Sequence, residues 1–379
     1  MRVDLIMQSS SIKPTFKQLQ QFQRRYRHEI ETAFSAYKKH HCNPTSLLFI
    51  ENKLPTKPIV QEGELFQAIV IGGTYARSAL CRKSSRSTLG FTYVKKPKVS
   101  RLPIIKSRGE FVLYLANQID PRVQKITLVM ANALKPIFTR GRLDGRLVEV
   151  SNEKAFATHD LVGKYIGKEI EPPLSDHFKK AIIISVANDG LCLLLSGLTK
   201  KRMQKGLVFG IVGTGINFGF LFKDRIVINL ESAEFNAFVP SNTGKMLAEQ
   251  GLGSPLGREA SGKFLYLHFN DYLKKRRLLY PPLGSTEELS QLASSHAWDV
   301  SKLAQSFLYR SASLVACQIA GIANFLRSDI CCIMEGSLFW KGHNYKQTVS
   351  KIVQKLTLRR VEFLKIPNAE ILGAVKLII

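Results

Sequence analysis

The stretch LVFGIVGTGINFGFLFKDRIVINLE, residues 207–231, decides the fold. Its apolar runs are separated by Gly213-Thr214-Gly215 and by the charged break Lys223-Asp224-Arg225. Runs of this length between such breaks predict a meander of strands with a glycine-flanked threonine at its first turn. Glycines let backbone amides turn toward an anion, and a threonine hydroxyl adds a donor. Taken alone, a hairpin chosen for its turn geometry is the better explanation of these glycines.

A second stretch of the same kind lies upstream. Residues 64–82, ELFQAIVIGGTYARSALCR, combine an apolar strand, the turn Gly72-Gly73-Thr74 and a second strand that carries Arg77. Two strand–turn–strand units in one chain predict two related half-domains, each offering a turn of phosphate size. The pair is far more specific than either turn alone.

Length and composition are those of a soluble protein with two domains of ordinary size. The chain has 379 residues, of which 45% are hydrophobic and 22% charged. Its six cysteines include no CxxC pair, and most lie in apolar runs, which predicts buried, reduced thiols in a cytoplasmic protein. Only His40-His41-Cys42 could touch a metal, and without a second ligand cluster we expect no metal site. The N-terminus lacks the apolar core of a signal peptide, and no window is a clean membrane span.

The formal net charge is +26, from 55 Lys and Arg against 29 Asp and Glu. Such a balance raises the hypothesis of a nucleic-acid binder. The densest basic clusters, residues 95–98 and 274–277, are short and lack interleaved aromatics. A solvated basic surface is therefore favoured, and its potential would also attract a polyanionic nucleotide.

The remaining segments alternate between helical and strand patterns. Residues 43–63 read as an extended connector, and residues 97–103 are expected to end the strand 87–94. A further helical piece is expected after Pro172-Pro173. Strands are predicted at 87–94, 126–131, 144–150, 181–187, 329–334 and 361–366, and helices within 14–40 and at 109–119, 159–170, 191–198, 261–272, 285–293, 300–327, 345–356 and 372–379.

The buried strand 181–187 ends at Asn188-Asp189-Gly190. Open α/β sheets place ligands at the carboxyl ends of such strands. Turn chemistry alone would also select Asn-Asp-Gly. Function is favoured here because a helix-like apolar run, rather than a return strand, follows directly.

One motif is rejected. Residues 257–263, GREASGK, have the glycine and lysine spacing of a Walker A phosphate loop. Phe264 stands where the metal-binding Ser or Thr belongs, and no strand is predicted before the motif.

Together these motifs resemble the hexokinase family, which has the actin-like ATPase fold. The resemblance runs from about Ser46 to the end of the chain. The matching segments are Leu54-Pro55-Thr56, IGGTYAR at 71–77, EKAF at 153–156, VAND at 186–189, GTGIN at 213–217, NLESAEF at 229–235, SGKFL at 261–265 and EGSLFWKGHNY at 335–345. The order and spacing of the whole set are specific, whereas each motif alone would be weak.

The resemblance implies an α/β fold, a two-lobed actin-like ATPase (ribonuclease H-like) with a cleft between a small and a large lobe. Residues 1–62 would supply N-terminal helices and a connector packing on the large lobe. Residues 63–187 would form the small lobe and 188–365 the large lobe. Residues 366–379 would be a short C-terminal segment returning to the small lobe.

The resemblance also implies an ATP-dependent hexose kinase, as in the carbohydrate phosphorylation step of glycolysis. Asp189 would be the catalytic base, accepting the proton of a primary sugar hydroxyl as that oxygen attacks the γ-phosphate of ATP-Mg. Lys154 would act beside it. Asn188, Asn217 and Glu231 would hold the other sugar hydroxyls. The nucleotide would be held by Gly72, Gly73, Thr74, Arg77, Gly213, Thr214, Gly215, Gly336 and Ser337.

The expected ligands are therefore a hexose and ATP, with Mg²⁺ carried by the nucleotide. Neither a membrane nor a nucleic acid is an expected partner. The oligomeric state, the particular sugar and the donor nucleotide stay open.

Several positions depart from the family pattern. Val70 stands where the family has an aspartate that helps to place the metal. Tyr75-Ala76 replaces Asn-Phe, Ala131 or its neighbour falls on a sugar-contacting serine, and Glu153 replaces a threonine. A second sugar-binding glutamate is expected near Gly257. Nearby Glu259 has the wrong offset, and the role is not carried over to it.

Two functions of different classes remain open. The first is an active kinase, and the second is a catalytically silent hexokinase-like protein that binds sugar as a sensor or scaffold. Asp189 favours the first, because sugar binding alone does not demand a base there. Val70 favours the second, because a buried valine cannot hold a metal's water. The nucleic-acid hypothesis rests on charge alone.

Overall fold

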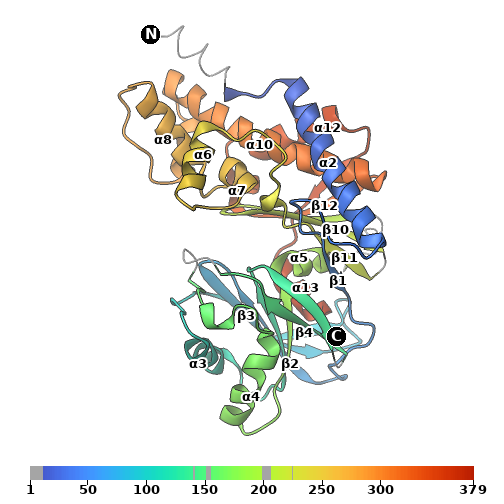
Figure 1. Ribbon diagram of the computed structural model, residues 1–379. Helices are drawn as coiled ribbons and strands as arrows, with labels where there is room; N and C mark the ends of the chain where they lie inside the picture. Colours follow the sequence, from blue (N-terminus) through green and yellow to red (C-terminus); the bar gives the residue numbers. More distant parts are fainter. Residues whose placement is uncertain (1–11, 140, 151–154, 199–205, 224) are drawn as a thin grey trace. The chain divides into compact units, whose positions relative to one another are not determined.

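The computed structural model describes residues 12–139, 141–150, 155–198, 206–223 and 225–379. Contacts divide the chain into two units, each assembled from separate stretches of sequence (Figure 1). Unit 1 contains the residues up to Phe49, together with Val208–Phe220 and Leu230–Lys365. Unit 2 contains Ile50–Leu207, Leu221–Asn229 and Ile366–Ile379.

The strands of unit 1 lie in the order β10-β9-β12-β13. β9 (Leu207–Val212) and β10 (Ile216–Lys223) pair antiparallel around the turn at 213–215. β12 (Ile330–Glu335) and β13 (Val361–Leu364) pair in parallel. β11 (Ile226–Asn229) follows β10 in sequence, so the strands predicted within 207–231 are confirmed.

Two long helices pack against each other in unit 1 (Figure 1). α2 (Phe16–Lys38) begins with a capping box, in which Thr15 and Gln18 each bond the other's backbone amide. α10 (Trp298–Leu326) is the helix that the pattern of 300–327 predicts. At their contact, Cys317 Sγ donates to Leu19 O at 3.3 Å.

Shorter helices complete unit 1, and most lie within a few residues of their predicted positions. The helix predicted at 261–272 begins later, because residues 261–264 turn toward the β9–β10 loop. These helices are η3 (Ser232–Glu234), α6 (Asn242–Glu249), α7 (Pro255–Ala260), α8 (Leu265–Lys275), α9 (Thr286–Ser294), α11 (Ser337–Lys341) and α12 (Tyr345–Leu356).

Unit 2 contains a sheet of order β4-β3-β2-β5-β8. β2, β5 and β8 run parallel, whereas β3 and β4 are antiparallel to their neighbours. At the carboxyl ends of β5 and β8, Met130 lies opposite Asn188. The strands span β2 (Leu65–Ile71), β3 (Tyr75–Lys83), β4 (Phe91–Arg101), β5 (Lys125–Met130) and β8 (Ile183–Asn188).

Helices cover both faces of this sheet. α3 (Arg108–Gln118) and α4 (Ile166–Phe178) share a buried apolar cluster with one face. α5 (Asp189–Gly197) and α13 (Ala369–Lys376) contact strands of the sheet and pack on each other. A Cβ at Gly373 would lie 1.7 Å from Cys192 O, so these two helices touch backbone to backbone.

The remaining elements of unit 2 are short. β1 (Ile50–Lys53) pairs antiparallel with β11, within the segment predicted as a connector. β6 (Leu134–Thr139) and β7 (Arg142–Leu147) form a hairpin, and η1 (His159–Leu161) precedes α4. Asp144 on β7 is buried and accepts from Gly167 N at 2.8 Å and Lys168 N at 3.1 Å. It therefore caps the amino end of α4 from outside the helix.

One predicted strand end is wrong. β4 does not stop before 97–103 but continues through Pro97 to Arg101. The pairing shifts between Ser78–Lys98 and Leu80–Lys95, which leaves an extra residue on β4 beside Pro97. β4 is an edge strand, and a proline is tolerated at an edge or a bulge because no ladder hydrogen bond is lost.

The helix α4 also differs from its prediction. Instead of a second piece after Pro172-Pro173, one helix runs through both prolines. Pro173 has no amide to bond the carbonyl of Glu169, four residues earlier. Arg108 Nη2 donates to that carbonyl at 2.8 Å instead. A side chain from α3 thus replaces the bond that the proline removes.

No helix in the described part of the chain is both long and apolar enough to span a membrane.

Candidate functional site

The turn between β9 and β10 lies against two other glycine loops. Gly213 N donates to Gly215 O at 2.9 Å, and Gly262 N donates to Gly213 O at 2.7 Å. A Cβ at Gly262 would lie 2.7 Å from Gly213 O. Gly336 has φ +110°, and a Cβ there would lie 2.2 Å from Val212 O. Only glycine permits three backbone segments to approach so closely.

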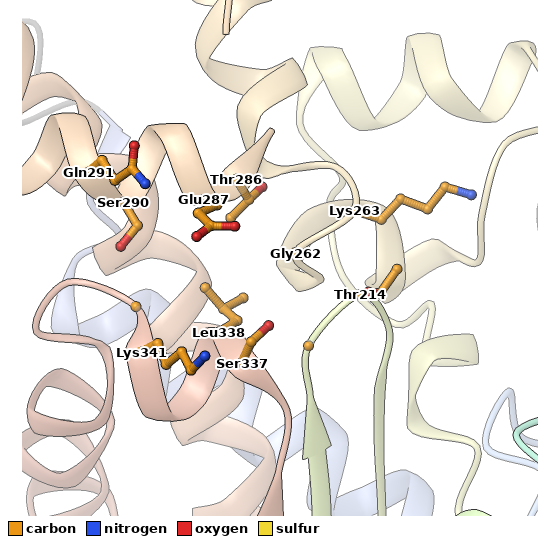
Figure 2. A pocket seen from close by; sticks show the side chains of 12 residues that line it. Thr214, Gly262, Lys263, Thr286, Glu287, Ser290, Gln291, Ser337, Leu338 and Lys341 are labelled. Carbon is orange, nitrogen blue, oxygen red and sulfur yellow. The ribbon is translucent and has the colours of Figure 1, made fainter. Parts of the chain in front are cut away.

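These loops form one side of a cavity of about 310 Å³ in unit 1 (Figure 2). We call Gly213, Thr214, Gly262 and Lys263 its glycine wall. The α9 wall consists of Thr286, Glu287, Ser290 and Gln291. Ser337, Leu338, Lys341 and Gly342 complete the lining.

Charged and polar groups lie around the whole lining of the cavity. Glu287 places its acid on the α9 wall, whereas the glycine wall carries a lysine, Lys263. Burial lowers the pKa of that lysine below its ordinary value. Within the described residues, Thr286 Oγ1 is buried and has no hydrogen-bond partner. The cavity therefore offers backbone amides and the Lys263 cation along the glycine wall, and a carboxylate, an amide and hydroxyls along the α9 wall. A second cation, Lys341, lies in the remaining lining.

Sequence reasoning found only part of this cavity. Gly213, Thr214 and Ser337 were expected to bind nucleotide, and the structure brings all three to one lining. The sequence does not predict the α9 wall, since the pattern of residues 285–293 indicates only a helix. Lys263 belongs to the rejected Walker A motif, and helix α7, rather than a strand, precedes it.

In unit 2, the carboxyl end of β8 holds the predicted Asn188-Asp189 pair. Asn188 is 6% exposed and caps α5, accepting from Gly190 N at 2.9 Å. Asp189 is the first residue of α5 and half-buried, and its Oδ1 accepts from Gly190 N at 2.8 Å. The helix dipole favours a carboxylate at this end.

Two further asparagines hold Asn188. Its Nδ2 donates to Asn132 O at 3.0 Å, and Asn229 Nδ2 lies 3.4 Å from its Oδ1. All three are buried. Neither Asn132 nor Asn229 was assigned a role from sequence, because their contact depends on β5, β8 and β11 meeting.

The two other expected sugar residues lie in unit 1. Asn217 is buried on β10, and its Oδ1 accepts from Ser232 N at 3.1 Å. Glu231, the preceding residue, has left-handed backbone angles of φ 46° and ψ 54°. A non-glycine residue in this conformation is strained, and such strain concentrates at functional sites.

The first turn, Gly72-Gly73-Thr74, joins β2 to β3 in unit 2. Gly72 N donates to Tyr75 O at 2.9 Å, and Gly73 O accepts from Ala155 N at 3.1 Å. Gly73 and Thr74 line a hollow together with two basic residues, Arg101 and Lys106. This turn therefore also lies in a cationic surrounding.

The other expected positions are placed as follows. Arg77 on β3 forms an ion pair with Glu370 on α13. Val70 is 2% exposed on β2, between Arg77 and Val129 on the neighbouring strands. Lys154 and Glu153 lie outside the described residues. Glu259, which received no role, is fully buried with Arg310 Nη2 at 2.5 Å.

Comparison with solved structures identifies the class of fold. The hexokinase from Schistosoma mansoni complexed with glucose matches with a TM-score of 0.78 at 17% identity, covering 99% of this chain and 98% of that chain. Another hexokinase crystal structure gives 0.75 at 16% identity and covers 98% of each chain. A ROK hexokinase from Thermus thermophilus gives 0.57 at 14% identity, covering 83% of this chain and 97% of that chain. The chain has the two-lobed α/β fold of the actin-like ATPases, as its motifs predicted.

Sequence comparison narrows this class. The family model described as Hexokinase matches residues 269–378, a segment that includes the α9 wall and Gly336-Ser337. No curated protein matches the sequence. The predicted resemblance to the hexokinase family is confirmed, at a low level of sequence identity.

Proposed function

We propose that this protein is an ATP-dependent hexose kinase, which transfers the γ-phosphate of ATP to the 6-hydroxyl of glucose or a similar hexose. The cavity of unit 1 supports this best. A nucleoside triphosphate is complementary to this lining, because it has anionic phosphates at one end and hydroxyls and a base at the other. Phosphates would lie along the glycine wall, and Glu287 and its neighbours would accept and donate hydrogen bonds to ribose and base.

The sugar acceptor is inferred from the likeness to hexokinases, one of which is complexed with glucose. Asn188 and Asn217 are buried amides, and Glu231 is a half-buried carboxylate. Such groups form hydrogen bonds with sugar hydroxyls. Lys154 would add a fourth contact.

Asp189 would be the base. It would accept the proton of the 6-hydroxyl as that oxygen forms a bond to the γ-phosphorus. The bond between the γ-phosphorus and the β,γ-bridging oxygen breaks, and ADP leaves with the electron pair. Asn188 caps the same helix end and would fix the backbone that carries Asp189. The Mg²⁺ would arrive on ATP as part of the substrate.

The first experiment is a coupled assay of ADP release from the purified protein, with ATP-Mg and a panel of hexoses. Asp189→Ala is the control. Sugar-dependent turnover that disappears in this variant would support the kinase. Sugar-dependent turnover that survives the substitution would contradict the assignment of the base.

A second function, a silent sugar-binding sensor or scaffold, is favoured by Val70. This valine is buried where a metal-placing carboxylate would be expected, and its neighbours Arg77 and Val129 supply no acid. Turnover and melting temperature, both measured on the purified wild-type protein, distinguish the two functions. Absence of turnover, combined with a rise in melting temperature on adding sugar, would favour the silent form. In that case Val70→Asp should raise turnover, if the missing acid is what limits it.

A further inference from the structure

Lys263 is joined to the phosphate turn through its backbone. Lys263 N donates to Thr214 O at 3.3 Å, beside the 2.7 Å bond from Gly262 N to Gly213 O. These two bonds run side by side and fix the start of the lysine side chain against the turn. The side chain then extends past Thr214, away from the α9 wall (Figure 2).

This geometry differs from that of a Walker A loop. There the lysine follows a strand and opens a helix. Here α7 ends at Ala260, and α8 begins only at Leu265. Lys263 reaches a phosphate-sized turn because Gly262 allows its loop to lie on the turn, not because the loop itself wraps a phosphate.

The surroundings of the amine favour an anionic ligand. Its Nζ lies 5.4 Å from the centre of the Phe264 ring, and the side chain is half-buried. Burial of a cation is unfavourable, which is why the pKa of Lys263 lies below its ordinary value. A phosphate bound at this end of the cavity would offset that desolvation.

The charge inventory points the same way. Val70, on the strand before the first turn, supplies no carboxylate to help hold a metal. Two lysines, Lys263 and Lys341, line the cavity that contains the second turn, and Lys263 is the one whose backbone bonds the turn. A protein cation can neutralise phosphate charge without a metal.

We propose that Lys263 binds the β- and γ-phosphates of the donor nucleotide, so that phosphate recognition at the second turn depends on a protein cation as well as on Mg²⁺. This inference rests on the proposed nucleotide cavity. It adds a specificity residue that distinguishes a nucleotide from its nucleoside.

The test is calorimetric titration of the full chain with adenosine and with ADP, each with and without Mg²⁺. Lys263→Met should weaken ADP binding roughly ten- to hundredfold, as expected for loss of a hydrogen bond between charged groups. Adenosine affinity should stay unchanged. Lys263→Arg should keep ADP binding, because it keeps the charge. Lys245→Met removes the same charge from the exposed surface of α6 and should leave both affinities intact.

ADP affinity measured at a series of pH values distinguishes a lysine that binds phosphate from one that only supports the fold. In the wild type, ADP affinity should fall at alkaline pH, as Lys263 loses its proton in the free protein before it does so in the complex. Lys263→Arg should show no such fall, because arginine does not titrate in this range.

Three outcomes would overturn the inference. If Lys263→Met weakens adenosine and ADP equally, the lysine supports the fold of the cavity only. If Lys263→Met behaves like Lys245→Met while the wild type binds ADP, the inference fails and the proposed cavity stands. If the wild type binds neither ligand, the nucleotide cavity fails, and the inference with it.

Discussion

Asp189 is the residue on which the proposed chemistry depends. It begins α5 directly after a buried strand, and the neighbouring Asn188 is held by Asn132 and Asn229. The carboxylate thus stands on a backbone fixed by packing and by hydrogen bonds. A general base needs such fixed placement, because proton transfer requires contact with the reacting hydroxyl.

Asp189→Asn should therefore abolish catalysis without harming the fold. The amide has nearly the same shape but cannot take a proton, so turnover should fall by about 10²–10⁴-fold. Thermal unfolding should remain close to that of the wild type. Asp176→Asn, on the exposed side of α4, is the matched control. Equal turnover in the two variants would remove Asp189 from the mechanism.

Glu231 combines strain with a proposed role in sugar binding. Its left-handed backbone, at φ 46°, is unfavourable for any residue with a Cβ. Glu231→Gly should therefore be more stable than Glu231→Ala by about 1 kcal/mol. Both variants should lose the carboxylate and hence bind sugar more weakly. Urea unfolding measures the first effect and thermal shifts on adding sugar measure the second. Unchanged sugar affinity in both variants would mean that Glu231 is strained for a reason other than sugar.

Residues predicted from sequence are those whose role is set by their neighbours in the chain. The Gly/Thr turns and Asn188-Asp189 are of this kind, because a few consecutive residues determine a turn or the end of a strand. Lys263 and the α9 wall are not, since they reach the turn only through contacts between distant segments. The sequence pattern therefore predicts the helix α9, but it does not predict that this helix faces the turn between β9 and β10.

At the scale of elements, a side chain from one helix or strand often forms the hydrogen bond that a backbone group of another element lacks. Arg108 takes the carbonyl that Pro173 leaves without a partner, and Asp144 caps α4 from β7. Both contacts explain why α4 exists as one helix despite its two prolines. They also explain the error in predicting it, because local propensity alone argues against this helix.

Asp144→Ala should test the cap. Its carboxylate accepts from the amides of Gly145, Gly167 and Lys168, and these would be left without a partner in the interior. The free energy of unfolding should fall by about 2–4 kcal/mol, as lost hydrogen bonds to a buried charge predict. The midpoint of urea unfolding measures it. Asp176→Ala should change the same midpoint by less than about 0.5 kcal/mol, since surface substitutions have small effects. A change no larger in Asp144→Ala would show that water replaces the carboxylate.

At the scale of the molecule, unit 1 contains a buried ionic network that makes its stability depend on pH. Glu259 pairs with Arg310, and His268 Nε2 donates to Arg258 O at 2.8 Å. Burial, which outweighs the attraction of Glu259, lowers the pKa of His268 below its ordinary value. Burial alone would raise the pKa of Glu259, but Arg310 and His268 together lower it. Asp271 is the other acid that faces the histidine.

The lowered pKa values of His268 and Glu259 both make the folded protein less stable as the pH falls. The unfolded chain takes up a proton at a histidine near pH 6.5, and at a glutamate near pH 4.3, before the folded chain does. The stabilising contribution of His268 is complete above about pH 6.5 and is lost as the pH falls toward its folded value. The melting temperature should therefore fall as the pH is lowered from 7 to 5.

His268→Gln removes this titration and should flatten the fall, even though the variant is less stable at pH 7. His28→Gln, on the exposed surface of α2, should leave the pH dependence as it is. Identical pH slopes in the two variants would place the acid sensitivity elsewhere.

Helix α13 has a consequence for how the protein is made. It packs backbone to backbone on α5 and contacts β2 and β5, yet it follows every other helix and strand described in unit 2. On a translating ribosome, β2, β5 and α5 leave the exit tunnel roughly 170 to 300 residues before the helix that covers them. Throughout that interval an apolar surface has no intramolecular cover. Unit 2 is thus completed only after nearly all of unit 1 has been synthesised, and apolar surface exposed for that long favours aggregation of the nascent chain.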